Sequence, residues 1–142
     1  MTTAFSHLLR VRWAEVDAQG VVFNPNYFLY ADVAATEFLR ALGVVQTSTP
    51  DLLESYVVDA RASFRAPARF DDLLDIGVRV DRIGRSSYAL RIDVMRVGAV
   101  LVEVWLTYVR AVDGASIPLS ETFRLALAAT TSAGESSEDG KP

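Results

Sequence analysis

The segment 24–43, NPNYFLYADVAATEFLRALG, constrains the fold of this chain more than any other part of the sequence. Asn24 is a favourable helix N-cap, Pro25 suits a first helical position, and Gly43 suits the position that follows a helix. Apolar side chains cover most of the surface between these ends. One polar stripe with a spacing of four residues interrupts it: Asp32, Thr36 and Arg40. A helix with so much apolar surface is largely buried, so the sequence predicts a core helix that other elements must cover.

Five segments outside this helix alternate apolar and polar residues, which is the period of a strand with one buried face. They are 7–13, 56–66, 74–81, 87–96 and 99–112. The short connections at 83–86 and 97–98 are typical of hairpins, so most of these strands should be antiparallel. The sequence therefore predicts an α+β fold, in which a five-stranded, mostly antiparallel sheet wraps one long central helix.

One domain should account for the globular part of the chain, because 142 residues are typical of a single domain. A short helix is expected over 119–127. The polar segment 128–142 has the composition of a disordered tail, so the predicted domain is 1–127. A sheet on one side of the helix leaves its far side, or a sheet edge, uncovered. A symmetric homodimer is the commonest way to cover such a surface.

Composition excludes several classes of protein. The chain has no cysteine and a single histidine, so disulfides and thiolate chemistry are excluded, and a two-histidine metal site would need two chains. A net charge of −4 disfavours nucleic acid as a partner, because binding a phosphate backbone requires a basic face. No apolar run is long enough to span a membrane, and the N-terminus lacks the layout of a secretory signal. We therefore expect a cytoplasmic protein without a bound metal.

Carboxylates are the strongest candidates for a base or nucleophile, because the familiar serine, phosphate-loop and zinc motifs are absent. Asp17 stands out because it lies in the loop that leads into a helix N-terminus, where unpaired N–H groups and the helix dipole favour negative charge. Capping of a turn, or an ion pair with an arginine, would also explain Asp17. Glu15 is a weaker candidate because it precedes the loop proper. The single histidine, His7, has no evident acidic or serine partner, so we expect a structural or surface role for it.

The segment 11–43 resembles the N-terminal motif of the hotdog-fold acyl-CoA thioesterases, and within them the 4-hydroxybenzoyl-CoA thioesterase type. The resemblance rests on an acid at Asp17, then Gly-Val-Val at 20–22, then Pro-Asn-Tyr at 25–27, which opens the long helix. The strand pattern over residues 5–127 is compatible with the same family. The resemblance implies a hotdog fold and hydrolysis of an acyl-CoA to a free acid and CoA. No cofactor is implied, since CoA enters only as part of the substrate.

The resemblance also implies residue roles. Asp17 would attack the thioester carbonyl or activate water, and the backbone N–H of Asn24 would hold the thioester oxygen. Asp32 matches a carboxylate that binds the ring hydroxyl in 4-hydroxybenzoyl-specific members, from the neighbouring subunit, although a solvated polar stripe would also explain it. Residues expected to bind substrate are Gly20, Phe23, Tyr27 and Asp32. Candidates for binding the CoA phosphates are Arg61, Arg65, Arg82, Arg85, Ser86 and Ser87. A solvated turn would also explain the last four.

One departure from the family concerns the helix start. Many relatives carry a histidine at or next to the position of Asn24, where this chain has Phe23-Asn24, so a mechanism that needs that imidazole is excluded. We predict a thioesterase that acts on a small acyl-CoA, aromatic and 4-hydroxybenzoyl-like or short and branched, and that forms homodimers which assemble into a homotetramer. The alternatives are a short-chain aliphatic acyl-CoA thioesterase and a non-catalytic module that binds acyl-CoA or another small ligand. Dehydration of hydroxyacyl thioesters is disfavoured, because the long helix offers no histidine.

Overall fold

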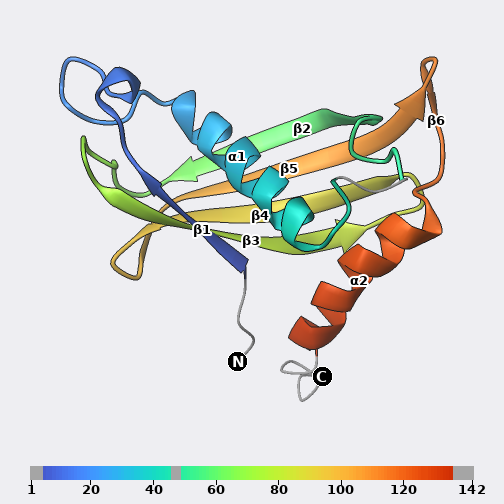
Figure 1. The fold of residues 1–142 in the computed structure, drawn as a ribbon. Helices are drawn as coiled ribbons and strands as arrows, with labels where there is room; N and C mark the ends of the chain where they lie inside the picture. The colour runs from blue at the N-terminus through green and yellow to red at the C-terminus, as the bar shows by residue number, and fades with distance from the viewer. Residues whose placement is uncertain (1–4, 46–48, 136–142) are drawn as a thin grey trace.

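The computed structural model describes residues 5–45 and 49–135. In chain order the elements are β1 (Phe5–Arg10), the 3₁₀-helix η1 (Trp13–Glu15), α1 (Asn26–Ala41), β2 (Ser55–Phe64), β3 (Leu73–Ile83), β4 (Ser87–Arg96), β5 (Ala99–Val112), β6 (Ala115–Ser116) and α2 (Glu121–Glu135). The main strands form an antiparallel sheet in the order β1-β3-β4-β5-β2, and the short β6 pairs with β5. Helix α1 lies across one face of this sheet (Figure 1).

The core lies between α1 and the inner face of the sheet. On the helix side, Tyr30, Ala31 and Ala34 are completely inaccessible, and the two alanines let the helix approach the sheet closely. On the sheet side, the inaccessible residues alternate along the central strands: Leu74, Ile76, Leu90, Ile92, Val94, Val102 and Val104. The α+β architecture predicted from the sequence, a central helix on a mostly antiparallel sheet of five main strands, is confirmed. Within the described ranges, no helix combines the length and the apolar content that a membrane span requires.

The predicted first strand, 7–13, is wrong at its C-terminal end. β1 stops at Arg10 because the chain then turns into η1. Trp13 lies in this turn and is 73% exposed, although the alternation of the sequence placed it on the buried face. Its ring contacts the ring of Phe70 edge-on, with centroids 5.2 Å apart. Alternation alone could not reveal the turn, since a single-turn 3₁₀-helix carries little periodicity.

The predicted capping of the long helix by Asn24 is also wrong. Helix α1 begins at Asn26, and Pro25 occupies the N-cap position with no side-chain cap bond. The chain enters the helix through tight turns, in which the N–H groups of Asn26 and Tyr27 donate to the carbonyls of Phe23 and Asn24 over 2.8 and 3.1 Å. These main-chain bonds satisfy donors that a side-chain cap would otherwise serve.

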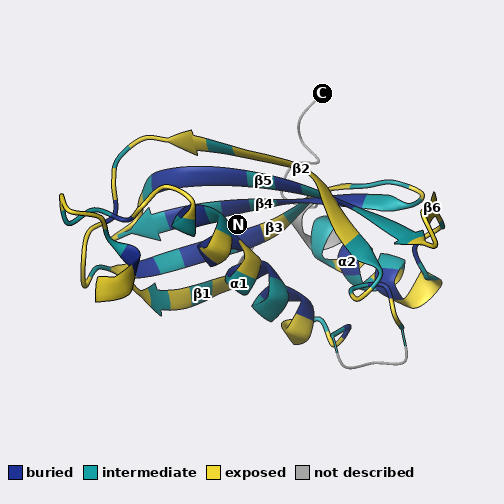
Figure 2. Ribbon diagram, turned by 90° about the horizontal axis from the view of Figure 1, so that it is seen from above, coloured by how far each residue is buried: buried dark blue, intermediate teal, exposed yellow. Residues whose placement is uncertain are grey.

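Strand β2 is one of the two edges of the sheet, and β1 is the other. It pairs with β5 on one side, and a register shift between Val57 and Asp59 interrupts the pairing. Figure 2 shows β2 mostly exposed, next to buried stretches of β5 and β4. Its large exposed apolar side chains are Tyr56, Val57, Val58 and Phe64. An apolar strand with an unpaired edge tends to pair with another chain unless charge or a cover prevents it.

Helix α2 extends further than the sequence predicted. A short helix was expected over 119–127 and a disordered tail from 128, but residues 128–135 are helical, and 136–142 lie outside the described residues. Phe123 and Leu127 are fully buried, and the ring of Phe123 lies 5.1 Å from that of Tyr88 on β4. These tertiary contacts anchor α2 to the sheet and make it part of the domain. The composition of the segment does not reveal them.

Candidate active site

The segment that carries the predicted base is a small hairpin. The backbone N–H of Phe23 donates to the carbonyl of Glu15 over 3.0 Å, and that of Asp17 donates to the carbonyl of Val21 over 2.9 Å. Gly20 closes the turn with a φ of 79°, a left-handed conformation that glycine adopts without steric cost. One arm of the hairpin therefore carries Asp17, and the other arm runs directly into the start of α1.

The Asp17 side chain is exposed at this hairpin. Its Oδ1 accepts the backbone N–H of Gln19 over 2.8 Å, which is the turn-capping interaction typical of aspartate. Among the described residues, Oδ2 accepts no hydrogen bond, and none of the ion pairs they form involves Asp17. Asp17 thus caps its own turn with one oxygen, and its other oxygen is available to a proton or to a carbonyl carbon.

The start of α1 offers a backbone donor. Phe23 and Asn24 are both exposed. Within the described part of the chain, the backbone N–H of Asn24 donates no hydrogen bond. Free N–H groups and the positive end of the helix dipole favour negative charge on a nearby oxygen. Because this donor belongs to the backbone, the Asn24 side chain has no part in it.

Tyr27, predicted to contact substrate, is instead a packing residue within this chain. It is 1% exposed, and its hydroxyl accepts the backbone N–H of Ala68 over 2.9 Å. The carbonyl of Ala68 accepts the N–H of Val22 on the hairpin, also over 2.9 Å. Burial raises the pKa of the Tyr27 hydroxyl. Ala68 therefore ties the first turn of α1 and the hairpin to the connection between β2 and β3.

Asp32 lies two turns into α1 and is exposed. The Tyr108 hydroxyl on β5 has a raised pKa, chiefly because it is buried, with smaller contributions from Tyr88 and from the charge of Asp32. Asp32 is thus within electrostatic reach of β5. No hydrogen bond or ion pair of Asp32 occurs among the described residues, so a polar group of a ligand or of a second chain can reach it.

Two of the predicted phosphate-binding arginines point away from α1. Arg61 lies opposite Trp105 on the outer face of the sheet, with its guanidinium 4.9 Å from the ring centroid. Arg65 donates to Glu103 over 2.9 Å, and Arg91 donates to the same carboxylate over 2.7 Å. Both candidates therefore already have partners within the chain.

The other candidates lie together at the β3–β4 turn. Arg82 and Arg85 donate to the hydroxyls of Ser87 and Ser86 over 3.4 and 3.2 Å. Neither arginine pairs with a carboxylate within residues 5–45 and 49–135. This turn is far from the hairpin of Asp17, at the other end of the sheet (Figure 1). One chain alone does not bring the two groups together.

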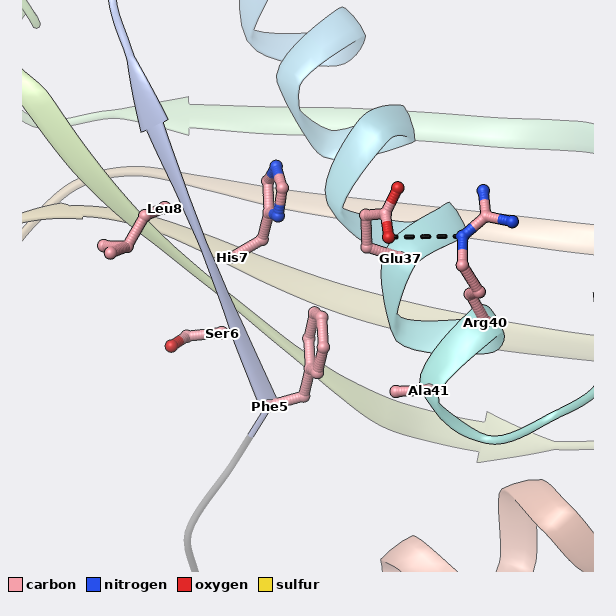
Figure 3. Close-up of a pocket in the computed structure, with 7 residues that line it drawn as sticks. All are labelled: Phe5, Ser6, His7, Leu8, Glu37, Arg40 and Ala41. Atoms are coloured by element: carbon pink, nitrogen blue, oxygen red, sulfur yellow. Dashed lines mark hydrogen bonds and ion pairs between the residues drawn. The ribbon is translucent and has the colours of Figure 1, made fainter.

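A shallow pocket of about 550 Å³ lies elsewhere, between β1 and the second half of α1. Figure 3 shows His7 and Phe5 reaching from β1 toward Glu37 and Arg40, which form an ion pair of 3.3 Å. His7 is half-buried there, and Asp17 is not part of the lining. No group of three or more His, Cys, Asp or Glu side chains in the described residues could hold a metal ion.

Sequence reasoning did not foresee the contacts of Glu15, the weaker candidate for a base. It is 7% exposed and accepts hydrogen bonds from Arg12 and from the hydroxyl of Tyr30. The spacing of Arg12 and Glu15 permits an ion pair, but Tyr30 is fifteen residues away in the sequence. Glu15 is buried by a helix that is distant in the sequence, so no local sequence pattern could predict its burial.

This arrangement of one long helix across an antiparallel sheet of five main strands is the hotdog fold. The expectation from the resemblance is confirmed at this level. The chain belongs to the Thioesterase superfamily, whose family model matches residues 19–103. The matched span begins two residues after Asp17.

Similar individual proteins agree with membership of the Thioesterase superfamily. The chain is similar to a putative esterase of Aquifex aeolicus (strain VF5), with 32% identity over 85 residues, or 59% of this chain and 66% of that protein. It is also similar to the acyl-CoA thioester hydrolase YbgC of Escherichia coli O157:H7, with 34% identity over 80 residues, or 56% of this chain and 60% of that protein. The matches thus span less than two thirds of these relatives.

A solved structure extends the similarity over most of the fold. The BH1999 gentisyl-coenzyme A thioesterase superposes with a TM-score of 0.76 and 27% identity, covering 87% of this chain and 99% of that one.

Proposed function

We propose that this protein hydrolyses an acyl-CoA thioester to a free acid and CoA. Membership of the Thioesterase superfamily and similarity to an acyl-CoA thioester hydrolase support this class of reaction. The observation that carries the proposal is the hairpin, which joins Asp17 to the start of α1 at Asn24. Within the described parts of the chain, one Asp17 oxygen and the Asn24 N–H have no hydrogen-bond partner.

The chemistry follows from these two groups. The Asn24 N–H and the α1 dipole would hold the thioester oxygen and stabilise the negative charge that develops on it. Asp17 would either take a proton from an attacking water or attack the carbonyl carbon itself, forming an acyl-enzyme anhydride that water then hydrolyses. In both routes the carbon–sulfur bond breaks, the CoA sulfur leaves as a thiolate and takes up a proton, and one water is consumed. The position of Asp17 supports both routes equally.

A homodimer would complete the binding site. Pairing of two exposed β2 edges about a twofold axis is antiparallel, so it would place the β3–β4 turn of one copy at the same end as the hairpin of the other. Val102 and Val109, which pair with Phe64 and Ser87, lie seven positions apart on β5, or about 23 Å at about 3.3 Å per residue. A second copy paired in this way would shorten that separation. Arg82 and Arg85 are then the better candidates for the CoA phosphates, and two such dimers would form the proposed homotetramer.

The acyl group is proposed to be small. Asp32 lies eight residues after Asn24, or about 12 Å along the helix at 1.5 Å per residue, which suits a compact acyl group with a polar end. The similarity to a gentisyl-coenzyme A thioesterase favours a hydroxylated aromatic acid. A short aliphatic acyl group is the second candidate, favoured by the exposed apolar ring of Phe23 at the hairpin.

The test is release of free thiol from a panel of benzoyl, hydroxybenzoyl, short-chain and palmitoyl CoA esters. We expect fastest turnover with the small aromatic esters. A preference for palmitoyl-CoA would overturn the proposed acyl group. Tight binding of the esters with no thiol release, measured by calorimetry on the same panel, would show a binding module and overturn the proposed reaction.

A further inference from the structure

Glu15 and Asp17 lie on the same arm of the hairpin, but their environments are opposite. Asp17 is exposed, whereas the Glu15 side chain is 9% exposed and faces α1. A buried carboxylate beside an exposed one needs a physical reason, because burying a charge is costly unless hydrogen bonds compensate it.

The Glu15 carboxylate is saturated with donors. Oε1 accepts the backbone N–H of Arg12 over 2.9 Å and the hydroxyl of Tyr30 over 2.8 Å. Oε2 accepts Nε of Arg12 over 2.7 Å and a second guanidinium nitrogen of the same residue. A carboxylate offers about four acceptor sites, so Glu15 retains none for a proton from water or for a carbonyl carbon. It is therefore neither the base nor the nucleophile.

The charge of Glu15 is permanent at neutral pH. Burial raises the pKa of this carboxyl, but hydrogen bonds from Arg12 and Tyr30 outweigh burial and hold the pKa below its usual value. Burial, and the hydrogen bond to Glu15, in turn raise the pKa of the Tyr30 hydroxyl. Tyr30 therefore keeps its proton and remains a donor throughout the neutral range.

The backbone of Glu15 makes a second set of connections. Its carbonyl accepts the N–H of Phe23, on the other arm of the hairpin, over 3.0 Å, and the side-chain amide of Asn26, in the first turn of α1, over 2.9 Å. One residue thus joins the exit of β1, both arms of the hairpin and two turns of α1. Asp17 follows it by two residues, and Asn24 follows directly after Phe23.

We propose that Glu15 is a positioning residue, which holds the Asp17 arm of the hairpin in register with the N-terminus of α1 through Arg12, Tyr30 and Asn26. It would touch no substrate and would act through Asp17. This inference rests on the proposed function, because the two groups that Glu15 would align are the proposed base, Asp17, and the proposed oxyanion donor, the N–H of Asn24. A misplacement of a reacting group by about 1 Å can lower the rate about a hundredfold.

The first test is Glu15→Gln, which keeps size and burial but turns a donor toward the Arg12 guanidinium. We expect kcat for the best ester of the panel to fall about ten- to a hundred-fold, with KM little changed, because small misplacements of reacting groups lower the rate of the chemical step. Tyr30→Phe removes one donor and leaves the Arg12 pair intact, so we expect a smaller fall in kcat than for Glu15→Gln. Glu37→Gln is the control, since Glu37 pairs with Arg40 at the same three-residue spacing outside the site. It should leave kcat unchanged.

The second test is a double-mutant cycle with Asp17→Asn, in which rates are referred to the folded fraction measured by urea unfolding. If Glu15 acts through Asp17, Glu15→Gln causes no further loss in the Asp17→Asn background. Multiplicative losses would overturn the proposal, as would a fall in stability with kcat per folded molecule unchanged.

Hydrogen exchange separates this inference from the proposed function. Glu15→Gln and Tyr30→Phe should accelerate exchange of the hairpin N–H groups of Asp17 and Phe23 while the N–H groups of β4 and β5 stay protected. If the wild-type protein releases no thiol but the hairpin loosens in this way, the proposed reaction fails and the positioning role of Glu15 survives. If hairpin exchange is unchanged in both variants, the positioning role fails whatever the activity.

Discussion

The two ends of the sheet hold aspartates in opposite states. At one end, Asp17 is exposed; one of its oxygens accepts a hydrogen bond in its own turn, and the other has no partner among residues 5–45 and 49–135. At the other end, Asp51 is 0% exposed and is held by the N–H of Ser120 over 2.8 Å, by the hydroxyl of Thr49 and by Arg110 at 3.6 Å. Ser120 in turn accepts the N–H of Phe123 over 3.2 Å, in the first turn of α2.

The difference separates an acid suited to chemistry from an acid that holds the fold. A buried carboxylate whose two oxygens both accept hydrogen bonds stabilises its surroundings and is shielded from substrate, whereas an exposed carboxylate can react and contributes little to stability. Glu15 belongs to the Asp51 class although it lies beside Asp17. The predictions that follow test this separation, starting with the largest expected effect.

Asp17→Asn should abolish most of the activity and leave the fold intact. Loss of a positioned base or nucleophile lowers kcat by about a hundred- to ten-thousand-fold, while an exposed side chain with one backbone bond contributes little to stability. Thiol release and urea unfolding measure the two quantities on the same sample. Activity close to that of wild type would remove Asp17 from the mechanism.

Val58→Lys tests whether the two ends of the sheet meet across a dimer. A lysine on an exposed edge strand opposes pairing with another strand, so we expect a monomer in sedimentation velocity. Thiol release should fall in proportion to the monomer fraction if the proposed dimer forms the site, because the β3–β4 turn of one copy would then no longer reach the hairpin of the other. A monomer with full activity would show that one chain holds a complete site.

Asp51→Ala should have the reverse profile of Asp17→Asn. Removal of one partner from a buried charged network costs about 3–5 kcal/mol of folding free energy, since the Ser120 N–H at the start of α2 loses its acceptor and Arg110 loses one of its two carboxylate partners. Urea unfolding measures this cost. The kcat per folded molecule should stay at the wild-type value, and a large fall in kcat would mean that the far end of the sheet also takes part in the reaction.

The Asp51 contribution should also depend on pH. Burial raises the pKa of this carboxyl. The hydrogen bonds from Thr49 and Ser120 and the charge of Arg110 lower it by more, so the pKa lies below its usual value. A carboxyl with a lowered folded-state pKa contributes stability above its unfolded value, about 3.9, and this contribution disappears as the pH falls through the folded-state pKa. The stability difference between wild type and Asp51→Ala should therefore shrink below about pH 4. A difference that is constant down to pH 2 would contradict this origin.

Tyr27→Phe should give the smallest effect. The substitution leaves the buried N–H of Ala68 without its acceptor, which costs about 1–3 kcal/mol, and the ring still packs against Phe64 at 5.6 Å. Thermal unfolding should show the loss, and KM for the acyl-CoA panel should be unchanged. A raised KM would restore Tyr27 as a substrate contact.

Much of the fold was predictable because the strong patterns are local. The limits of β4 and β5 agree with the predicted segments 87–96 and 99–112, since tight turns mark both ends of the pair of strands. The weaker predictions failed where tertiary contacts override local preference. Asn24 caps nothing because main-chain carbonyls already serve the first turn of α1, and α2 continues past Leu127 because Phe123 and Leu127 pack against the sheet.

By itself the sequence determined that a long apolar helix must lie on a sheet of alternating strands, and that Asp17 leads into its N-terminus. Periodicity and turn residues encode those features over a few neighbouring positions. Only the tertiary structure decided that Glu15 is saturated while Asp17 keeps a free oxygen, because the donor on Tyr30 comes from another element. Solvent access and hydrogen-bond saturation depend on distant parts of the chain, and they separate the reactive acid from the structural one.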